Sequence, residues 1–413
     1  MKEKSGIILC VALLVSLAVA GCRSVQPQRA ELRQAERLVR NEAVYGDKVH
    51  AAWLGKFIGL IAGQPTEGWG REQIERKARA IGFYPITGYM PANFDTGLTN
   101  FLLGNFDGSP SNDDTDLMLT SLLALREHGT DLTARNIAET WLKYVSVACT
   151  AELVALHNFQ RGIWPPESAK VGNPYQEIIG AQMRGEIWGM IAPGMPTLAA
   201  DYAQRDASLT HTGNGIFGEQ FIAALVSAAM VESDRNKIIQ TALKTIPADS
   251  AYAEAVRDAV AWHRQYPDWQ SAWERLDKKW GFLKNGKRDA AFADAQYNTG
   301  KDPYLWNDFK ASYADVNGAA VTLALLYGDG DFTKSVCLAV MIGYDNDCNG
   351  GTVGALLGAI NGTQAIAESW KAPLRDIYQT TLKLPEKQLK ISAIAAETAQ
   401  YGQRVVKASA ARR

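Results

Sequence analysis

The stretch that decides the fold is AAWLGKFIGLIAG, residues 51–63, an apolar run with one charged residue. Its small residues recur every four positions: Ala51, Gly55, Gly59 and Gly63. That spacing predicts a helix with the small residues on one face. Because a glycine inside a helix costs about 1 kcal/mol against alanine, the stripe needs a compensating reason. Close approach of a second helix backbone is the natural one.

A second stripe lies near the other end of the chain. Gly354, Gly358 and Gly362 recur every four residues, beside Ala355 and Ala359. The same argument predicts another helix with a bare face, and two such backbones can come unusually close. Plain core packing would explain both stripes, and it is compatible with a functional site mounted on the two helices.

Apolar spacing elsewhere is also helical, and alternating strand patterns are hard to find. The clearest helical segments are residues 49–61, 117–125, 221–231, 316–327, 336–341 and 353–360. Proline-rich and glycine-rich breakers between such segments indicate loops, and none forms a hinge between domains. We therefore expect an all-α fold with a single domain over residues 46–413.

The first residues indicate export. Residues 1–21 combine early lysines with an apolar stretch too short for a stable membrane helix, which predicts a signal peptide. The sequence Val19-Ala20-Gly21-Cys22 resembles the lipobox of bacterial lipoproteins, in which Cys22 carries the lipid. Ordinary signal cleavage after Ala20 is the alternative. We expect a lipid-anchored protein of the bacterial cell envelope, attached to the membrane through Cys22, with residues 22–45 as a polar tether.

Composition narrows the possible partners. The chain has 413 residues, 47% of them hydrophobic, and a net charge of -1. This balance supports a large core and gives no basic excess for binding a nucleic-acid polymer. Of the five cysteines, Cys149, Cys337 and Cys348 lie beyond the signal and lipobox. Three cysteines do not make a disulfide framework, although one bridge would be possible.

Two groups of oxygen ligands, residues 112–115 (NDDT) and 345–347 (DND), each lead into an apolar helical run. One acidic group could simply cap a helix. Two such groups suggest a metal site, because buried carboxylates repel one another unless a cation holds them together. The candidate ligands are Asn112, Asp113, Asp114, Asp345 and Asp347. An all-oxygen set favours Mg²⁺, with Mn²⁺ or Ca²⁺ possible, over Zn²⁺.

We expect Asp345 and Asp347 to point to one side of an extended segment, just before a turn at Gly350 and Gly351. The side chains of the adjacent residues Asp113 and Asp114 should point in different directions. One carboxylate can then bridge outward, and the other can support a second ligand position. This arrangement accommodates one or two metal ions.

These motifs resemble the ADP-ribosylglycohydrolase family. Residues 59–67 (GLIAGQPTE) are similar to the family's Gly-Asp-Ala-Leu-Gly-x-Pro-x-Glu element, and residues 112–115 to its Thr-Asp-Asp-Thr element. Residues 345–348 (DNDC) are similar to its Asp-x-Asp-Thr element, and residues 206–211 (DASLTH) to its Asp-Ala-x-x-Thr-His segment. The resemblance implies a compact orthogonal helical bundle with metal ions at the bottom of a cleft that binds the ribose of an ADP-ribosyl group.

Three positions depart from the family's motifs. Leu60 stands where the family has an acid, Asn112 stands for a threonine ligand, and Cys348 stands for the threonine after the second aspartate. The resemblance therefore supports one ion at residues 112–114 and Asp347 better than a second at Asp345, Asp347 and Cys348.

The resemblance also suggests which residues act on substrate. Glu67 matches a glutamate that contributes to catalysis in some family members, although it could also be a solvated loop carboxylate; Asp113 or Asp114 could serve instead. The candidate substrate-binding residues are His211, Asn214, Gly350, Gly351 and Arg184.

The expected function is an exported, metal-dependent hydrolysis of an N- or O-glycosidic bond in an ADP-ribosyl or related ribosyl conjugate, by metal-activated water. The partner would be a small-molecule or glycoconjugate substrate. An envelope glycosidase acting on another sugar or nucleoside conjugate is one alternative, and a non-catalytic binding protein with the same fold is another.

Overall fold

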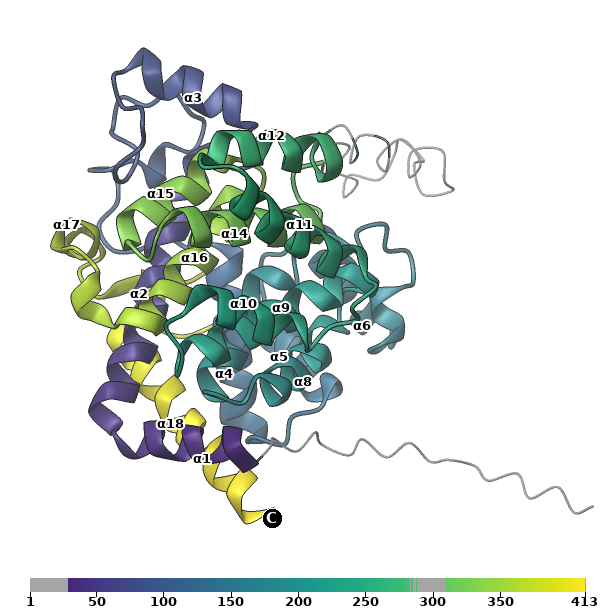
Figure 1. The fold of residues 1–413 in the computed structure, drawn as a ribbon. Coiled ribbons are helices and arrows are strands. Elements are labelled where there is room, and N and C mark those ends of the chain that lie inside the picture. Colours follow the sequence, from purple (N-terminus) through teal and green to yellow (C-terminus); the bar gives the residue numbers. More distant parts are fainter. Residues whose placement is uncertain (1–28, 283, 285–286, 288–309, 413) are drawn as a thin grey trace, which may run out of the picture.

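A computed structural model describes residues 29–282, 284, 287 and 310–412 as an all-α fold with one short sheet (Figure 1). The helices before residue 210 are α1 (Arg29–Arg40), α2 (Glu42–Gly63), α3 (Arg71–Ala80), α4 (Asp113–His128), α5 (Ala134–Tyr144), α6 (Thr150–Gln160), α7 (Glu186–Ile191) and α8 (Pro196–Ala207). The later helices are α9 (Gly213–Ala229), α10 (Arg235–Leu243), α11 (Ala251–Gln265), α12 (Trp269–Trp280), α14 (Ala314–Tyr327), α15 (Phe332–Ile342), α16 (Asn346–Asn361), α17 (Glu368–Lys371) and α18 (Ile391–Ala411). Strand β1 (Ile377–Gln379) pairs antiparallel with β2 (Gln388–Lys390).

Helices α2 and α16 form the centre of the bundle, with their two glycine stripes in direct backbone contact. A Cβ added to Gly59 would lie 1.9 Å from the carbonyl oxygen of Gly350, and one added to Gly55 would lie 2.0 Å from that of Gly354. No side chain fits at such distances, so only glycine permits this approach. The prediction that the stripes mark closely packed helices is confirmed.

All residues from 51 to 63 are buried, so the second half of α2 has no solvent-facing side. Helices of this kind lie in the core and are surrounded by other elements. All six segments expected to be helical lie in helices, although α9 ends at Ala229, two residues before the expected end. The sequence therefore predicted both the fold class and the central helix.

The expected tether is wrong over most of its length. Residues 29–40 form α1, in which Leu32 and Ala35 are buried, and α2 already begins at Glu42. Figure 1 shows α1 lying beside α18 at one end of the bundle. Apolar residues one turn apart give α1 a face to bury, so this segment packs instead of spacing the domain from a membrane.

The signal, Cys10 and the lipobox cysteine lie outside the described residues. Within the described ranges, no helix combines the length and apolar character needed to cross a membrane. Cys149, Cys337 and Cys348 are all free thiols.

Candidate active site

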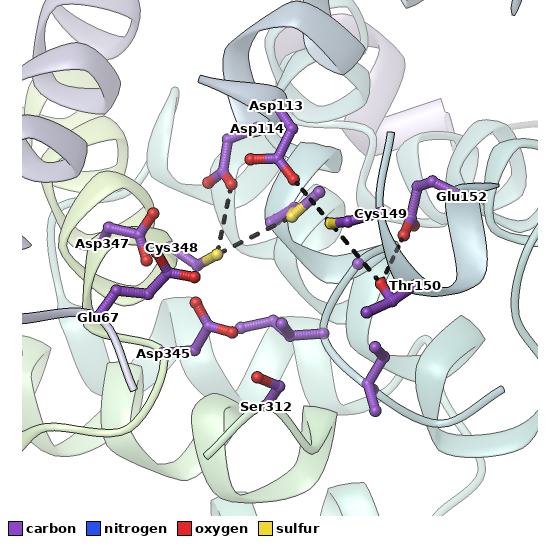
Figure 2. A pocket seen from close by; sticks show the side chains of 14 residues that line it. Glu67, Asp113, Asp114, Cys149, Thr150, Glu152, Ser312, Asp345, Asp347 and Cys348 are labelled. Atoms are coloured by element: carbon purple, nitrogen blue, oxygen red, sulfur yellow. Dashed lines mark hydrogen bonds between the residues drawn. The ribbon is translucent and has the colours of Figure 1, made fainter. Parts of the chain in front are cut away.

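A pocket with a volume of about 40 Å³ lies where the two oxygen-rich groups meet (Figure 2). This volume holds roughly three water molecules. Its acidic lining residues come from segments far apart in the chain: Glu67, Asp113, Asp114, Glu152, Asp345 and Asp347. The predicted convergence of residues 113–114 with residues 345–347 is therefore present, and Glu67 is part of it.

The first wall is the N-terminus of α4. Asn112 is the N-cap residue, and its side-chain oxygen accepts a hydrogen bond from the backbone N–H of Asp114 at 2.8 Å. Asp113 and Asp114 occupy the first helical turn, where free N–H groups and the helix dipole favour negative charge. The apolar run that follows anchors this turn in the core.

The second wall is the N-terminus of α16, and here two expectations need correction. Asp345 is the N-cap residue but Asp347 already lies in the helix, so the pair does not sit in an extended segment. Gly350 and Gly351 lie in the next turn of the same helix, with their Cα atoms facing Gly59 and Lys56. They make room for α2 and do not line the pocket, so their assignment to substrate binding is not supported.

Glu67 reaches the pocket from a loop that is tied to the second wall. The backbone N–H of Gly68 donates to the carbonyl oxygen of Tyr344 at 2.9 Å, and that of Tyr344 donates to Trp69 at 3.1 Å. The Asn346 amide donates to the Thr66 hydroxyl at 2.7 Å. These three hydrogen bonds fix the Glu67 carboxyl beside Asp345 and Asp347.

Glu67, Asp345 and Asp347 can each turn one oxygen toward a common point, with the three oxygens within 4.8 Å of one another. Asp345 and Asp347 are buried, and one oxygen of each has no hydrogen-bond partner. Burial and the neighbouring carboxylates raise the pKa of Asp347, and burial raises that of Asp345. Buried carboxylate oxygens without donors are the arrangement that a hard divalent cation satisfies.

The pKa values of the two other acids change in the same direction. Burial raises the pKa of Glu67 to about 8, with further contributions from Asp345 and Asp113. Burial also raises the pKa of Asp113 to about 7, assisted by Asp114 and Glu152. Without a bound cation the pocket therefore retains protons near neutral pH.

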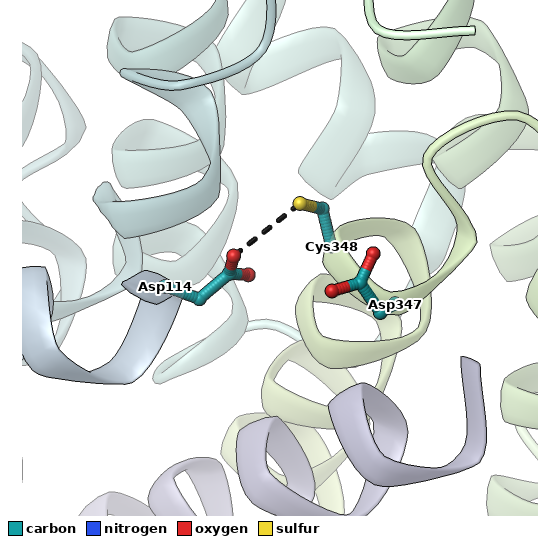
Figure 3. A group of neighbouring side chains, drawn as sticks. All are labelled: Asp114, Asp347 and Cys348. Atoms are coloured by element: carbon teal, nitrogen blue, oxygen red, sulfur yellow. Dashed lines mark hydrogen bonds between the residues drawn. The ribbon is translucent and has the colours of Figure 1, made fainter. Parts of the chain in front are cut away.

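A second possible ligand group consists of Asp114, Asp347 and Cys348 (Figure 3). The Cys348 thiol donates to one oxygen of Asp114 over 3.4 Å between sulfur and oxygen. Burial and the adjacent carboxylates raise the pKa of this thiol, so the sulfur stays protonated. As a thiol it is a poor ligand for Mg²⁺.

Asn112 is oriented differently from the expected metal ligand. Because its oxygen caps α4, its amide nitrogen faces Asp347 at 3.3 Å and also donates to the side-chain oxygen of Gln64. The Gln64 amide in turn donates to Glu67. Asn112 therefore helps to orient two carboxylates of the site, and its assignment as an oxygen ligand is not supported.

Sequence reasoning missed the lysine of α2. Lys56 is fully buried, and its ammonium lies 2.9 Å from Asp114 and 3.1 Å from Glu186. A single lysine in the otherwise apolar stretch of residues 51–63 was the available signal, since an unpaired lysine is almost never fully buried. Glu152 and Cys149 of the pocket lining were missed as well, and no pattern in the sequence marks them.

The remaining predicted substrate-binding residues lie outside the pocket lining. Arg184 is fully buried and donates to Asp206 at 3.1 Å and to Glu152 at 3.0 Å. It therefore holds Glu152, a lining residue, without lining the pocket itself. His211 is also fully buried, and burial together with Arg184 keeps its pKa well below the usual value. The Asn214 amide donates to Glu177 at 3.2 Å.

Comparison with known proteins agrees with this architecture. The profile of the family described as ADP-ribosylglycohydrolase matches residues 41–402, and the chain therefore belongs to that family. An uncharacterized protein of Archaeoglobus fulgidus is 22% identical over 360 residues, which cover 84% of this chain and 98% of that protein.

Among solved structures, a chain of an "ADP-ribosylglycohydrolase-related protein complex" superimposes with a TM-score of 0.51 at 21% identity. The match covers 87% of this chain and 99% of the other, and it supports the all-α fold. Membership in the family supports a glycohydrolase type of function and a small-molecule or ADP-ribosylated substrate.

Proposed function

We propose that this protein is a metal-dependent glycohydrolase that cleaves the N- or O-glycosidic bond of an ADP-ribosyl or related ribosyl conjugate. The observation that carries the proposal is the convergence of Glu67, Asp345 and Asp347 on one pocket, with two buried carboxylate oxygens left without partners. Burying carboxylate oxygens without partners lowers the stability of the fold, and a cluster with only a structural role would gain nothing that offsets this loss.

The donor set fits a hard divalent cation, preferably Mg²⁺, with Mn²⁺ or Ca²⁺ as alternatives. Asp345 and Asp347 would hold the ion, with Glu67 beside it. When bound, such an ion polarises ribose hydroxyls and lowers the pKa of a water molecule. The pocket has space for an ion with a few waters, so a sugar ring would lie at its open side, near the exposed lining residue Cys149.

Glu67 is the candidate general acid and base. Burial and the neighbouring carboxylates raise the pKa of Glu67 in the metal-free pocket, and a bound cation would lower it again, toward the range in which a carboxyl both takes and gives a proton. Glu67 would accept a proton from the attacking water, whose oxygen bonds to the anomeric carbon. The leaving group would depart with the electron pair of the glycosidic bond and would then receive that proton from Glu67. The Gln64 amide orients the Glu67 carboxyl for this step.

A product-release assay with Mg²⁺ tests the proposal. The substrates are ADP-ribosyl-arginine, ADP-ribosyl-serine, O-acetyl-ADP-ribose and simple nucleosides. Release from one of the first three, abolished by Asp347→Ala, is the expected result. Release from nucleosides alone would point to the envelope glycosidase, and release from none would favour a binding protein with the same fold.

We also propose export and lipid attachment at Cys22, on the basis of the sequence Val19-Ala20-Gly21-Cys22. Membrane attachment would then depend on the lipid. Mass spectrometry of the mature amino terminus should find a diacylglyceryl group on Cys22. An unmodified Cys22 would contradict this part of the proposal.

A further inference from the structure

The buried ammonium of Lys56 contacts one carbonyl oxygen and two carboxylates. The nitrogen lies 2.6 Å from the carbonyl oxygen of Met183, 2.9 Å from Asp114 and 3.1 Å from Glu186. The contacts with Met183 and Glu186 are hydrogen bonds, and the contact with Asp114 is an ion pair. Burial by itself lowers the pKa of Lys56, but Asp114 and Glu186 outweigh it, and the pKa lies above its usual value. With two carboxylates within 3.1 Å of its nitrogen, Lys56 is held as a positive charge in the core.

This charge engages the carboxylate that stands between the two possible ligand groups. One oxygen of Asp114 forms the ion pair with Lys56, and the other accepts from the Cys348 thiol. One buried oxygen of each of Asp114, Asp345 and Asp347 has no hydrogen-bond donor, but of these three only Asp114 has an ammonium beside it. The acids of the pocket thus divide into one that is already neutralised and two that still need a cation.

Helix α16 has a glycine where it passes the aliphatic part of the Lys56 side chain. A Cβ added to Gly351 would lie 2.9 Å from the Cδ atom of Lys56 and 3.3 Å from its nitrogen. Glu186, the second acid at the ammonium, is itself held by the Thr352 hydroxyl at 2.6 Å. A residue of α16 therefore provides the space for Lys56, and the next one fixes its partner.

We propose that the Lys56 ammonium is a fixed cation of the active site. It neutralises Asp114, leaves Asp345 and Asp347 to hold a single divalent ion beside Glu67, and takes the place of a second ion at Asp114, Asp347 and Cys348. Lys56 is a positioning residue in this scheme, because it acts through Asp114 and does not line the pocket. The inference rests on the proposed metal-dependent function, and it specifies that the site holds one divalent ion.

The test counts bound Mn²⁺ by titration calorimetry and by metal analysis after gel filtration, with no substrate present. Wild-type protein should bind one ion. Lys56→Met leaves Asp114 unpaired, so this variant should bind two ions and should melt at a lower temperature without metal. Lys56→Met/Asp114→Asn removes both charges and should return to one ion.

Lys48→Met is the matched control. Lys48 is another lysine of α2, but it donates to the carbonyl oxygens of Ala359 and Ile360 at the far end of α16. This variant should bind one ion, as the wild type does. Two ions in Lys48→Met would show that the extra ion does not depend on Asp114 and would overturn the inference.

Two ions in the wild type would overturn the fixed cation and leave the proposed function intact, whereas no ion would overturn both. One ion in a Lys56→Met protein of unchanged melting temperature would also overturn the fixed cation. If Lys56→Met does not fold, the double variant decides: recovery of a folded protein with one ion supports the role of Lys56, and failure to recover refutes it.

Discussion

Asp116 and Asp347 are both buried, but they differ in the hydrogen-bond donors around their carboxylates. Asp116 on α4 accepts hydrogen bonds from the Tyr378 hydroxyl at 2.6 Å and the Thr381 backbone at 3.0 Å. Its negative charge is satisfied by donors that join α4 to the C-terminal segment. Asp347 has one oxygen with no donor at all. Burial is common to both, so the missing donor is what makes Asp347 the better candidate for a metal ligand.

Asp347→Asn should therefore remove divalent binding while keeping the fold. The amide has nearly the same shape but no charge, and it relieves the repulsion from Glu67 and Asp345. Calorimetric titration with Mn²⁺ should show at least a hundredfold loss of affinity, on the order of 3 kcal/mol. Asp116→Asn is the control: it should lower stability and leave Mn²⁺ binding in place. Equal affinity in Asp347→Asn and wild type would contradict the assignment.

Glu67→Gln should separate chemistry from binding. Glutamine keeps an oxygen beside Asp345 but cannot exchange a proton, so kcat should fall by roughly 10²–10⁴ with Mn²⁺ affinity changed far less. Steady-state kinetics and calorimetry on the same preparation measure the two effects. Full turnover in this variant would exclude Glu67 from proton transfer.

The raised pKa values make stability depend on pH in a definite direction. Glu67 and Asp113 have ordinary values of 4.5 and 3.8 and folded values of about 8 and about 7. Between these limits the folded state holds more protons than the unfolded state. The metal-free protein should thus lose stability as the pH rises from about 4 to about 8.

Mg²⁺ should have its largest stabilising effect at the upper end of this range, because it binds the ionised carboxylates. Thermal melts in chelator and in Mg²⁺ across these pH values measure the difference. A metal-free protein that becomes more stable with rising pH would contradict the assigned pKa directions.

At the scale of the element, the helices and their pairing could be predicted because their causes are local. Apolar periodicity in the sequence predicts the helices, and the two glycine stripes predict that α2 and α16 pack closely. The position of Gly350 and Gly351 could not be predicted, because a glycine pair indicates a turn unless the facing backbone is known. The same holds for Lys56, whose partners Asp114 and Glu186 belong to other helices.

The glycine stripe gives a prediction with an internal control. Gly59→Ala places a Cβ against the carbonyl of Gly350, a contact between rigid backbones, and should destabilise the fold by about 3 kcal/mol or more. Gly46→Ala changes the same helix where nothing lies within 4 Å, and should stabilise it by up to about 1 kcal/mol. Urea denaturation of the two variants measures the contrast. Equal effects would mean that α2 and α16 do not touch as described.

At the scale of the whole molecule, α1 extends the domain before residue 41, where the family match begins. Leu32→Ala should destabilise the protein by about 2–4 kcal/mol, because Leu32 is only 5% exposed. Mn²⁺ affinity should stay the same, since α1 lies away from the pocket. Gln34→Ala, on the exposed side of α1, is the control. Wild-type stability in Leu32→Ala would restore the view of this segment as a tether.

The hydrogen bond between Asn346 and Thr66 joins residues 280 positions apart. A ribosome adding about 5–20 residues per second therefore leaves α2 without its partner for roughly 15–60 seconds. During that time the apolar second half of α2, with its bare glycine face, lacks the helix against which that face packs. The core around α2 and α16 can close only when the last quarter of the chain is present, so this protein should fold slowly for a helical one.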